Sequence, residues 1–514
     1  MDHVRHVVDD LPPGCEHTMA FWGVGDHGGG PTEQIIQWIR DNRDSVPGAR
    51  MEFSTMERAF NAMEQNAQLP EVIGEIQHHS IGCYVIERNV KGGVRRAEHA
   101  LARAQAVASD QERFLLTRAW QSLASHHFHD TLGGTCLPES YPFVIGDLGG
   151  ACALAEEVVA YGLRRRMAKL PGDPLPRLVL ANPGSVEFNG WHMARVWTER
   201  DWKADWRLLD EEGMEIPFQR IGEEIGHRCI LFHSRIPADG LRTYRLDLSQ
   251  PRAITASRVR VASDRIGNDS GLEIRAKVWG QEICCMDRVL PLGFHLVEDG
   301  TDTWSHDVVR YAEGPSKAIR WDSPEIVDRG PLRAAFVQRG TIGDTRLTAD
   351  WRVYADNSVA ELVLDVDWRA CQQVLKLVFP LNGEQTRMDG TPGMALGRQN
   401  DSRERPLQDW TLTETVGVVC PDAWAIDASP ERVRLTLMRA PFYALHGPIP
   451  GVYPRAILMD QGLHRFRFRF HLQPAKVETL QAEAMAFHRP PLDADVTQGM
   501  PTRYMRDGAQ RRQK

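Results

Sequence analysis

Apolar residues follow two different periods along this chain, and the change falls near residue 170. Upstream of it, apolar positions recur every three or four residues, which is the spacing of an amphipathic α-helix. Three segments carry this pattern: RRAEHALARAQAVA (95–108), QERFLLTRAWQSLASHHF (111–128) and ALAEEVVAYGLRRRMAKL (153–170). Because the connections between them are short, residues 94–169 are predicted to form a small bundle of three helices.

The segment PGDPLP (171–176) marks the clearest domain boundary, and apolar and polar residues alternate downstream of it. A period of two predicts half-buried β-strands, separated by turn-forming clusters such as GNDSG and YADNS. The strongest examples are VAELVLDVDW (359–368), QQVLKLVFPL (372–381), ERVRLTLMRA (431–440) and RFRFRFHL (465–472). So many strands predict β-sandwich architecture, as a small sandwich followed by a large one.

Near the N-terminus, a short apolar run precedes a glycine-rich loop and a helix. The run FWGV (21–24) is predicted to end a buried strand, GDHGGG (25–30) is the loop, and a helix begins at Pro31. Residues 51–66 repeat this order. Strand–loop–helix units predict an α/β domain with its site in the loops. The loop lacks the Gly-Lys-Ser/Thr ending of a phosphate-binding loop. It is either a tight turn or a place where the Asp26 carboxylate approaches a ligand.

Length and charge limit the classes of protein to which this chain can belong. The 514 residues exceed one hydrophobic core and predict three or four domains. A formal net charge of -8 argues against a nucleic-acid partner. No apolar run reaches the roughly 20 residues of a membrane-spanning helix, and the first residues lack the apolar centre of a signal peptide. Nine cysteines without a CxxC pair predict a reducing, cytoplasmic compartment. The long β-region offers surface for a homo-oligomer.

The densest cluster of candidate chemistry lies at the end of the second predicted helix, in LASHHFHDTLGGT (123–135). His126, His127, His129 and Asp130 fall within five positions, just before paired glycines. Imidazole is the commonest metal ligand, and an adjacent carboxylate can orient it or bind substrate. The same residues also suit a partly exposed, His-rich helix end, and the motif alone leaves both interpretations open.

Six stretches follow one another along the chain, and their order matters as much as their residues: GVGDHGGGPT, GEIQHHSIGCY, HFHDTLGGT, ANPGSVEFNGW, DGTDTWSHDVVRY and LMDQGLHRFRFRF. Together they resemble the bacterial-type α-mannosidases of glycoside hydrolase family 38, over about residues 21–490. The resemblance implies a multidomain fold in five parts. These are the C-terminal part of an α/β catalytic barrel (1–70), a three-helix middle domain (71–170), a small β-domain (171–260), a large β-sandwich domain (261–490) and a polar tail (491–514).

The resemblance also implies an activity and a set of site residues. Such enzymes release terminal α-linked mannose from oligosaccharides or glycosides with retention, through an intermediate on an aspartate, while a zinc ion holds the sugar. The family motif HHD-x3-GT has its counterpart in FHDTLGGT, where Phe128 replaces a histidine. It implies that His129 is a zinc ligand and that Asp130 contacts the substrate. Asp26 is the candidate general acid/base.

Two further zinc ligands and the nucleophile of the family have no counterpart in this sequence. They precede the glycine loop, and only 25 residues precede Asp26 here. We therefore expect an α-mannosidase that lacks its N-terminal part and is inactive alone. A truncated gene model, a frameshift or a separately encoded N-terminal half would explain the missing part. The alternative is a non-catalytic remnant that binds carbohydrate or acts as a scaffold. A zinc hydrolase unrelated to sugars would need a complete ligand set.

Overall fold

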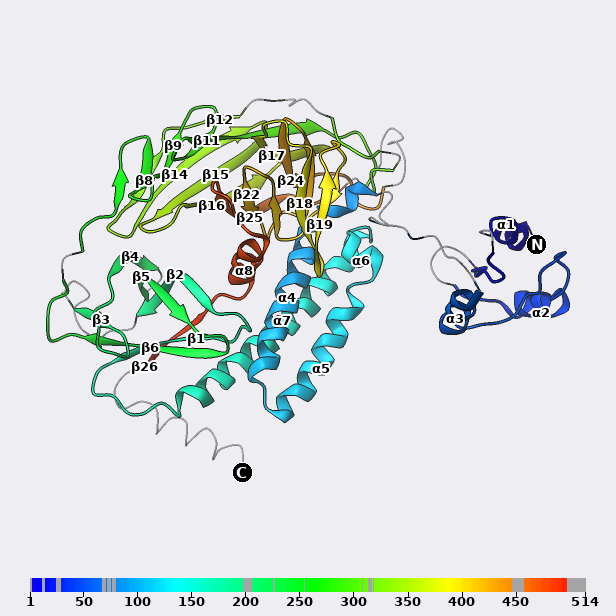
Figure 1. The fold of residues 1–514 in the computed structure, drawn as a ribbon, viewed down its shortest axis with the longest axis horizontal. Helices are drawn as coiled ribbons and strands as arrows, with labels where there is room; N and C mark the ends of the chain where they lie inside the picture. Colours follow the sequence, from blue (N-terminus) through cyan, green and yellow to red (C-terminus); the bar gives the residue numbers. More distant parts are fainter. Residues whose placement is uncertain are drawn as a thin grey trace. The chain divides into compact units, whose positions relative to one another are not determined.

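The chain divides into two compact units, residues 1–78 and residues 79–514, which are described in turn (Figure 1). The computed structural model describes residues 2–11, 14–24, 29–66, 71, 75, 80–196, 206–224, 227–253, 255–306, 308–312, 317, 319–445 and 457–496. No helix in these residues is long and apolar enough to cross a membrane.

The first unit contains three short helices, α1 (Asp2–Asp9), α2 (Glu33–Asp41) and α3 (Met56–Asn66). The predicted helix after the glycine loop is confirmed as α2. It begins where the Thr32 hydroxyl accepts a hydrogen bond from the Ile35 backbone N–H, the usual N-cap arrangement. Ile39 is the one side chain of α2 that is fully buried.

The strands predicted at residues 21–24 and 51–55 are not formed in the described part of the first unit. An extended segment becomes a strand only when a second backbone pairs with it. Here the Val24 N–H donates instead to the Gly30 carbonyl, at 3.0 Å. The apolar side chains stay exposed as a result, and Phe21 is 65% exposed. The predicted barrel remnant therefore has helices and no sheet among its described residues.

Three long helices of the second unit lie side by side: α4 (Arg88–Val107), α5 (Asp110–Ser125) and α7 (Tyr141–Met167) (Figure 1). They share one apolar core, which includes Val94, Leu101, Leu123, Leu148 and Val159. Helix α5 begins with a capping box, in which Ser109 and Glu112 satisfy each other's backbone N–H groups. The connections between the helices hold α6 (His129–Gly133) and the 3-10 turn η2 (Pro138–Ser140).

Helix α4 begins six residues earlier than the pattern predicted, at Arg88 rather than Val94, after the 3-10 turn η1 (Ile81–Tyr84). Gly92 and Gly93 lie between the observed and the predicted start of this helix. Glycine weakens an isolated helix, but packing favours it here. A Cβ atom on Gly93 would lie 3.0 Å from Leu148 Cδ1 of α7. The missing side chain lets the two helices approach closely, and this tertiary contact outweighs the low helix propensity.

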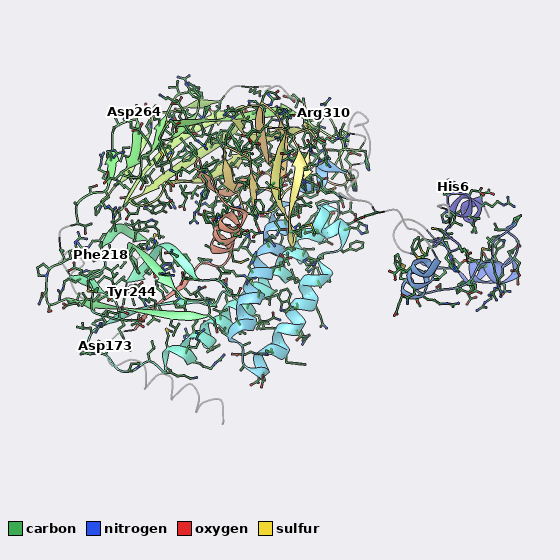
Figure 2. All side chains as sticks on the ribbon, in the orientation of Figure 1. His6, Asp173, Phe218, Tyr244, Asp264 and Arg310 are labelled. Atoms are coloured by element: carbon green, nitrogen blue, oxygen red, sulfur yellow. The ribbon has the colours of Figure 1, made fainter. Side chains whose placement is uncertain are left out.

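The small β-domain consists of two sheets around a common core, to which Phe218 and Tyr244 belong (Figure 2). One sheet has the order β26 (Leu492–Val496), β1 (Arg177–Asn182), β6 (Gly240–Asp247) and β3 (Arg207–Leu209). The other has the order β2 (Phe188–Val196), β5 (His227–Ile236) and β4 (Phe218–Glu224). Strand β26 lies in the segment predicted as a polar tail, yet it pairs antiparallel with β1 across more than 300 residues of chain.

The large β-domain packs a nine-stranded sheet against a ten-stranded sheet around one core. The first runs β20 (Arg405–Pro406), β23 (Ala425–Ser429), β24 (Arg432–Arg439), β17 (Gln373–Pro380), β11 (Arg288–Glu298), β10 (Gln281–Cys285), β9 (Leu272–Ala276), β8 (Arg265–Asn268) and β7 (Val259–Val261). The second runs β12 (Arg320–Trp321), β14 (Arg333–Ile342), β15 (Thr345–Tyr354), β16 (Val359–Trp368), β25 (Gly462–His471), β22 (Gly417–Val419), β21 (Trp410–Leu412), β18 (Thr386–Thr391) and β19 (Met394–Gln399), with β13 (Glu325–Arg329) paired to β14. Helix α8 (Val477–His488) contacts β21 and β22.

The four strands predicted most strongly from alternation are confirmed as β16, β17, β24 and β25. In β25 the period of two is visible in the packing: Phe466, Phe468 and Phe470 are buried in the core. The arginines between them point to the opposite face, where Arg465 forms an ion pair with Asp365 of β16.

Arg88, the first residue of α4, is buried in the large β-domain. Its guanidinium lies 4.3 Å from the Trp424 ring centroid and 4.2 Å from that of Phe466. It donates hydrogen bonds to the backbone carbonyls of Leu437 (3.1 Å) and Asp422 (2.7 Å). One side chain thus joins the first helix of the bundle to the sandwich.

Substitution Arg88→Met tests this joint. We expect the free energy of unfolding to fall by about 3 kcal/mol, because two buried carbonyls lose a charged donor. Thermal and denaturant unfolding of the full chain would measure the loss. The exposed arginine Arg118 of α5 gives a matched control, and Arg118→Met should change stability by less than about 0.5 kcal/mol. Equal stabilities for the two variants would contradict the role given to Arg88.

Candidate active site

The His/Asp motif occupies the chain between α5 and α7, and its geometry is set by a glycine. Helix α5 ends at Ser125. The short helix α6 starts at His129 and ends at Gly133, and it is capped by Gly134, whose φ of 84° is left-handed. A Cβ atom on Gly134 would lie 2.9 Å from Ile86 Cγ1 and 3.0 Å from Glu87 Cβ. Glycine is therefore needed here both for the turn and for its packing against the residues before α4.

The three histidines of the motif point to different partners. His126 is 6% exposed, and its Nε2 lies 3.2 Å from Asp147 Oδ2 of α7. His127 Nε2 lies 3.3 Å from Glu98 Oε1 of α4. These two rings hold the helices together, so their grouping into one site, which the sequence suggested, is not formed. The His129 side chain is 77% exposed and that of His127 is 42% exposed, so His129 is the imidazole that the motif presents most fully to solvent.

His129 and Asp130 lie together at the start of α6. His129 Nε2 is 3.6 Å from Asp130 Oδ2, and its ring centroid is 4.3 Å from that of Phe128. The Thr135 hydroxyl donates to Asp130 Oδ1 at 2.8 Å, which fixes the carboxylate while 29% of its side chain remains exposed. An exposed imidazole beside an oriented carboxylate can bind a cation or the hydroxyl groups of a ligand.

A half-buried lysine, Lys91, contacts the end of α6. Lys91 Nζ donates to the backbone carbonyls of Ile86 and Leu132, both at 2.7 Å, and to that of Gly133 at 3.2 Å. The last two belong to the carboxyl end of α6, where a positive charge is favourable. Burial lowers the pKa of Lys91 to about 8. Lys91 therefore fixes the helix that carries His129 and Asp130 to the first turn of α4.

Two buried carboxyl groups lie behind this lysine. Glu87 has a left-handed φ of 50° and accepts a hydrogen bond from the Tyr443 hydroxyl at 2.8 Å. Burial raises its pKa. Asp460 Oδ1 accepts from the Arg88 backbone N–H at 2.9 Å. Burial, and next the charge of Glu87, raise the pKa of Asp460 to about 7. Among the described residues, Asp460 Oδ2 has no hydrogen-bond partner.

Sequence reasoning missed Lys91, Glu87, Tyr443 and Asp460 as parts of this site. Lys91 stands in an unremarkable VKGG segment, and Asp460 was read only as part of the LMDQGLHRF stretch. The one signal in the sequence was that Glu87 and Asp460 lie close to or within stretches such as GEIQHHSIGCY and LMDQGLHRFRFRF. Their burial depends on the contact between the helices and the large β-domain, which no local pattern shows.

Asp26, the predicted general acid/base, lies outside the described residues, and its role stays a prediction. The predicted metal site is incomplete in the part of the chain that the structure describes. No group of three or more His, Cys, Asp or Glu side chains there could hold a metal ion. His129 and Asp130 supply two donors, whereas zinc sites use three or four protein ligands. We therefore assign no chemical step to zinc in these residues.

Comparisons with known proteins agree with this architecture. Residues 294–446 match the model of the glycosyl hydrolases family 38 C-terminal domain. Alpha-mannosidase G of Dictyostelium discoideum is 29% identical over 140 residues, which is 26% of this chain and 13% of that protein. Human alpha-mannosidase 2C1 is 30% identical over 137 residues, or 24% of this chain and 13% of the relative.

Two solved structures share the fold. A protein of glycosyl hydrolase family 38 from Enterococcus faecalis has a TM-score of 0.74 at 12% identity, over 97% of this chain and 68% of that one. An α-mannosidase from Enterococcus faecalis V583 has a TM-score of 0.70 at 11% identity, over 91% and 65%. The resemblance to glycoside hydrolase family 38 is confirmed. The chain matches 13% of the length of its curated relatives.

The buried Asp460 gives a pH-dependent prediction. A carboxyl whose folded-state pKa is about 7, against about 3.9 when unfolded, holds its proton more tightly in the folded chain. Its stabilising contribution is therefore complete below pH 4 and is lost as the pH rises through 7. Asp460→Asn should flatten the fall in stability between pH 4 and pH 7, by up to about 1.4 kcal/mol per pH unit. Denaturant unfolding across this range measures it, and parallel curves for the two proteins would contradict the prediction.

Proposed function

We propose that this chain is part of a zinc-assisted retaining glycoside hydrolase that releases terminal α-linked mannose from oligosaccharides or glycosides. The observation that carries the proposal is the exposed His129 beside Asp130, held by Thr135 on a helix that Lys91 fixes from below. A site of this kind needs groups held rigidly by their surroundings, and α6 meets that requirement. The family resemblance supplies the substrate class.

The roles we propose follow from the donors present. Asp130, an oriented carboxylate, accepts hydrogen bonds from sugar hydroxyl groups, and His129 contributes one imidazole toward a zinc ion. Zinc, when bound, polarises oxygen atoms and orients a substrate. Retaining hydrolysis also needs two carboxyl groups about 5–5.5 Å apart. We propose Asp26 as the acid/base, and a separately encoded N-terminal half as the source of the nucleophile and the remaining ligands. A cytoplasmic location accompanies this proposal.

A second candidate is carbohydrate binding without hydrolysis. The Phe128 ring is exposed and lies 4.3 Å from the His129 ring. An aromatic face beside a carboxylate suits a sugar, because the ring contacts C–H groups while the carboxylate accepts from hydroxyl groups. Binding of a mannoside is common to both candidates, and hydrolysis distinguishes them.

Titration of the full chain with methyl α-mannoside, followed by NMR, tests the shared part of the proposal. We expect the ligand to perturb signals of residues near α6, and Asp130→Asn to weaken binding at least tenfold by removing a charged acceptor. The control Asp110→Asn changes an exposed carboxylate at the start of α5 and should leave the affinity unchanged. Binding that is equal in the two variants would remove Asp130 from the site.

Hydrolysis of an aryl α-mannoside tests whether the chain is active alone or needs a second polypeptide. The purified 514-residue chain should show no turnover and should bind zinc weakly, because the described residues offer no third ligand. Co-expression with a polypeptide that supplies a His-x-Asp pair and a further aspartate should restore turnover. Measurable turnover by the chain alone would overturn the proposed need for a second polypeptide.

A further inference from the structure

The last described segment of the chain, residues 477–496, contacts three regions of the second unit, and we call it the C-terminal clasp (Figure 1). Its helix α8 buries Leu480 in a small core with Trp410 of the large β-domain. Beyond α8, Leu492 packs against the core of the helical bundle, and β26 pairs with β1 of the small β-domain. The proposed function assigns no role to this segment.

Two histidines stack where the clasp meets α4. The ring centroids of His99 in α4 and of His488, the last residue of α8, are 4.1 Å apart, and the ring planes differ by 15°. His99 is 7% exposed and the His488 side chain 8% exposed, so the contact is buried. Two positive charges at this separation would repel each other strongly, because little water screens them.

The hydrogen bonds of the pair show that the His99 ring is neutral. Arg489 Nε donates to His99 Nδ1 at 3.1 Å, and a guanidinium only donates, so Nδ1 carries no proton. His488 Nε2 lies 2.7 Å from Asp409 Oδ1, and a carboxylate only accepts, so this nitrogen carries a proton. The single proton of His99 is on Nε2, which is buried without a hydrogen-bond partner among the described residues.

The surroundings of His99 are mostly cationic. The charged and titratable groups that act on the pair are Arg95 and Glu98 of α4, His488 and Arg489 of the clasp, Asp409 before β21, and Arg103 of α4, which interacts electrostatically with Arg489 and with Glu156 of α7. Burial, then the charge of His488, then those of Arg95 and Arg489 lower the pKa of His99 to about 2. The ring therefore stays neutral as long as the clasp is closed.

Asp409, the carboxylate nearest to the pair, stays ionised in mild acid. Burial acts to raise the pKa of Asp409, but its hydrogen bond with His488 and the charges of His488 and Arg95 outweigh burial and lower that pKa. Arg95 in turn is held by Asp409 Oδ2 at 3.1 Å and by Glu98 Oε2 at 2.8 Å. The arginine therefore remains beside His99 when the pH falls below neutrality.

We propose that the C-terminal clasp is an acid-sensitive device, which stays closed only while His99 is neutral and opens from α4 and β1 when the chain is acidified. In the open clasp the His99 ring meets water and titrates with the ordinary histidine pKa of about 6.5. Below that pH the open state therefore binds one proton more than the closed state, and acid shifts the equilibrium toward opening. The equilibrium constant for opening rises about tenfold for each pH unit below 6.

The opening is local, because few contacts hold the clasp compared with the cores around it. Helix α8 has only two fully buried side chains, and β26 has five residues with one strand partner. Segments of this kind open at a lower free-energy cost than the whole fold. The inference concerns this contact alone and does not depend on the proposed function.

Hydrogen exchange of the full chain, followed by mass spectrometry, measures the opening of each segment. Between pH 6 and pH 4 we expect the protection factors of residues 477–496 to fall about tenfold per pH unit, while the core strand β16 keeps its protection. His99→Gln should remove this dependence on pH, because an amide oxygen still accepts from Arg489 but takes up no proton. The slope is the readout, since a general loss of packing lowers protection at every pH alike.

A second variant and a control complete the test. His99→Lys introduces a charge at neutral pH and should leave the clasp unprotected at pH 7, with β16 still protected. His295→Gln is the matched control: burial also lowers the pKa of His295, but this residue belongs to β11, between β10 and β17, so the slope should remain. Protection of the clasp that is constant between pH 6 and pH 4, that falls equally in His99→Gln, or that is lost together with that of β16 would overturn the inference.

Discussion

The second unit depends on four ionisable side chains, three buried and one half-buried, where the first helix of the bundle enters the large β-domain. Arg88 and Lys91 lie one turn apart on α4, and Glu87 and Asp460 lie beside them. Burying charge is costly, and such groups persist only when they are paired and hydrogen-bonded. Burial lowers the pKa of Arg88 to about 10 while the charges of Asp460 and Asp422 act against this fall, so the guanidinium stays charged at neutral pH. These contacts fix the start of α4 where the helical bundle, α6 and the large β-domain meet.

The candidate site follows from this joint. Lys91, in the first turn of α4, donates to the carbonyls of Leu132 and Gly133. Those carbonyls end α6, and α6 begins with His129 and Asp130. The side chains that fix the start of α4 therefore also fix the helix that carries His129 and Asp130.

Local sequence patterns predicted the elements whose apolar residues recur with a fixed period. They did not predict whether a segment finds a second strand to pair with. The alternation of RFRFRFHL predicted β25 because one face of that strand is buried and the other is charged. The run FWGV is just as apolar, but no second strand pairs with it among the described residues, so it stays extended and exposed. At β26 the prediction was wrong in the opposite direction: residues 492–496 were assigned to a polar tail, although LDADV alternates apolar and polar residues, and they pair with β1, far away in sequence. The partner of so short a strand cannot be read from the local pattern.

The site shows the same division. The histidine-rich motif is visible in the sequence, but its three rings are indistinguishable there. Only the structure shows that His126 is buried against Asp147 and that His127, although 42% exposed, lies 3.3 Å from Glu98. The pair Asp302 and His306 is a different case, since a spacing of four also suits a helix. Here the left-handed Ser305 between them turns the backbone out of helical geometry, so that Nδ1 of His306 lies 2.5 Å from the Asp302 carboxylate while 40% of the His306 side chain remains exposed. The Thr301 hydroxyl contacts that of Ser305, and the buried Arg439 donates to Thr301 and to the Thr303 carbonyl, so the shape of the loop at residues 299–306 depends on a buried arginine.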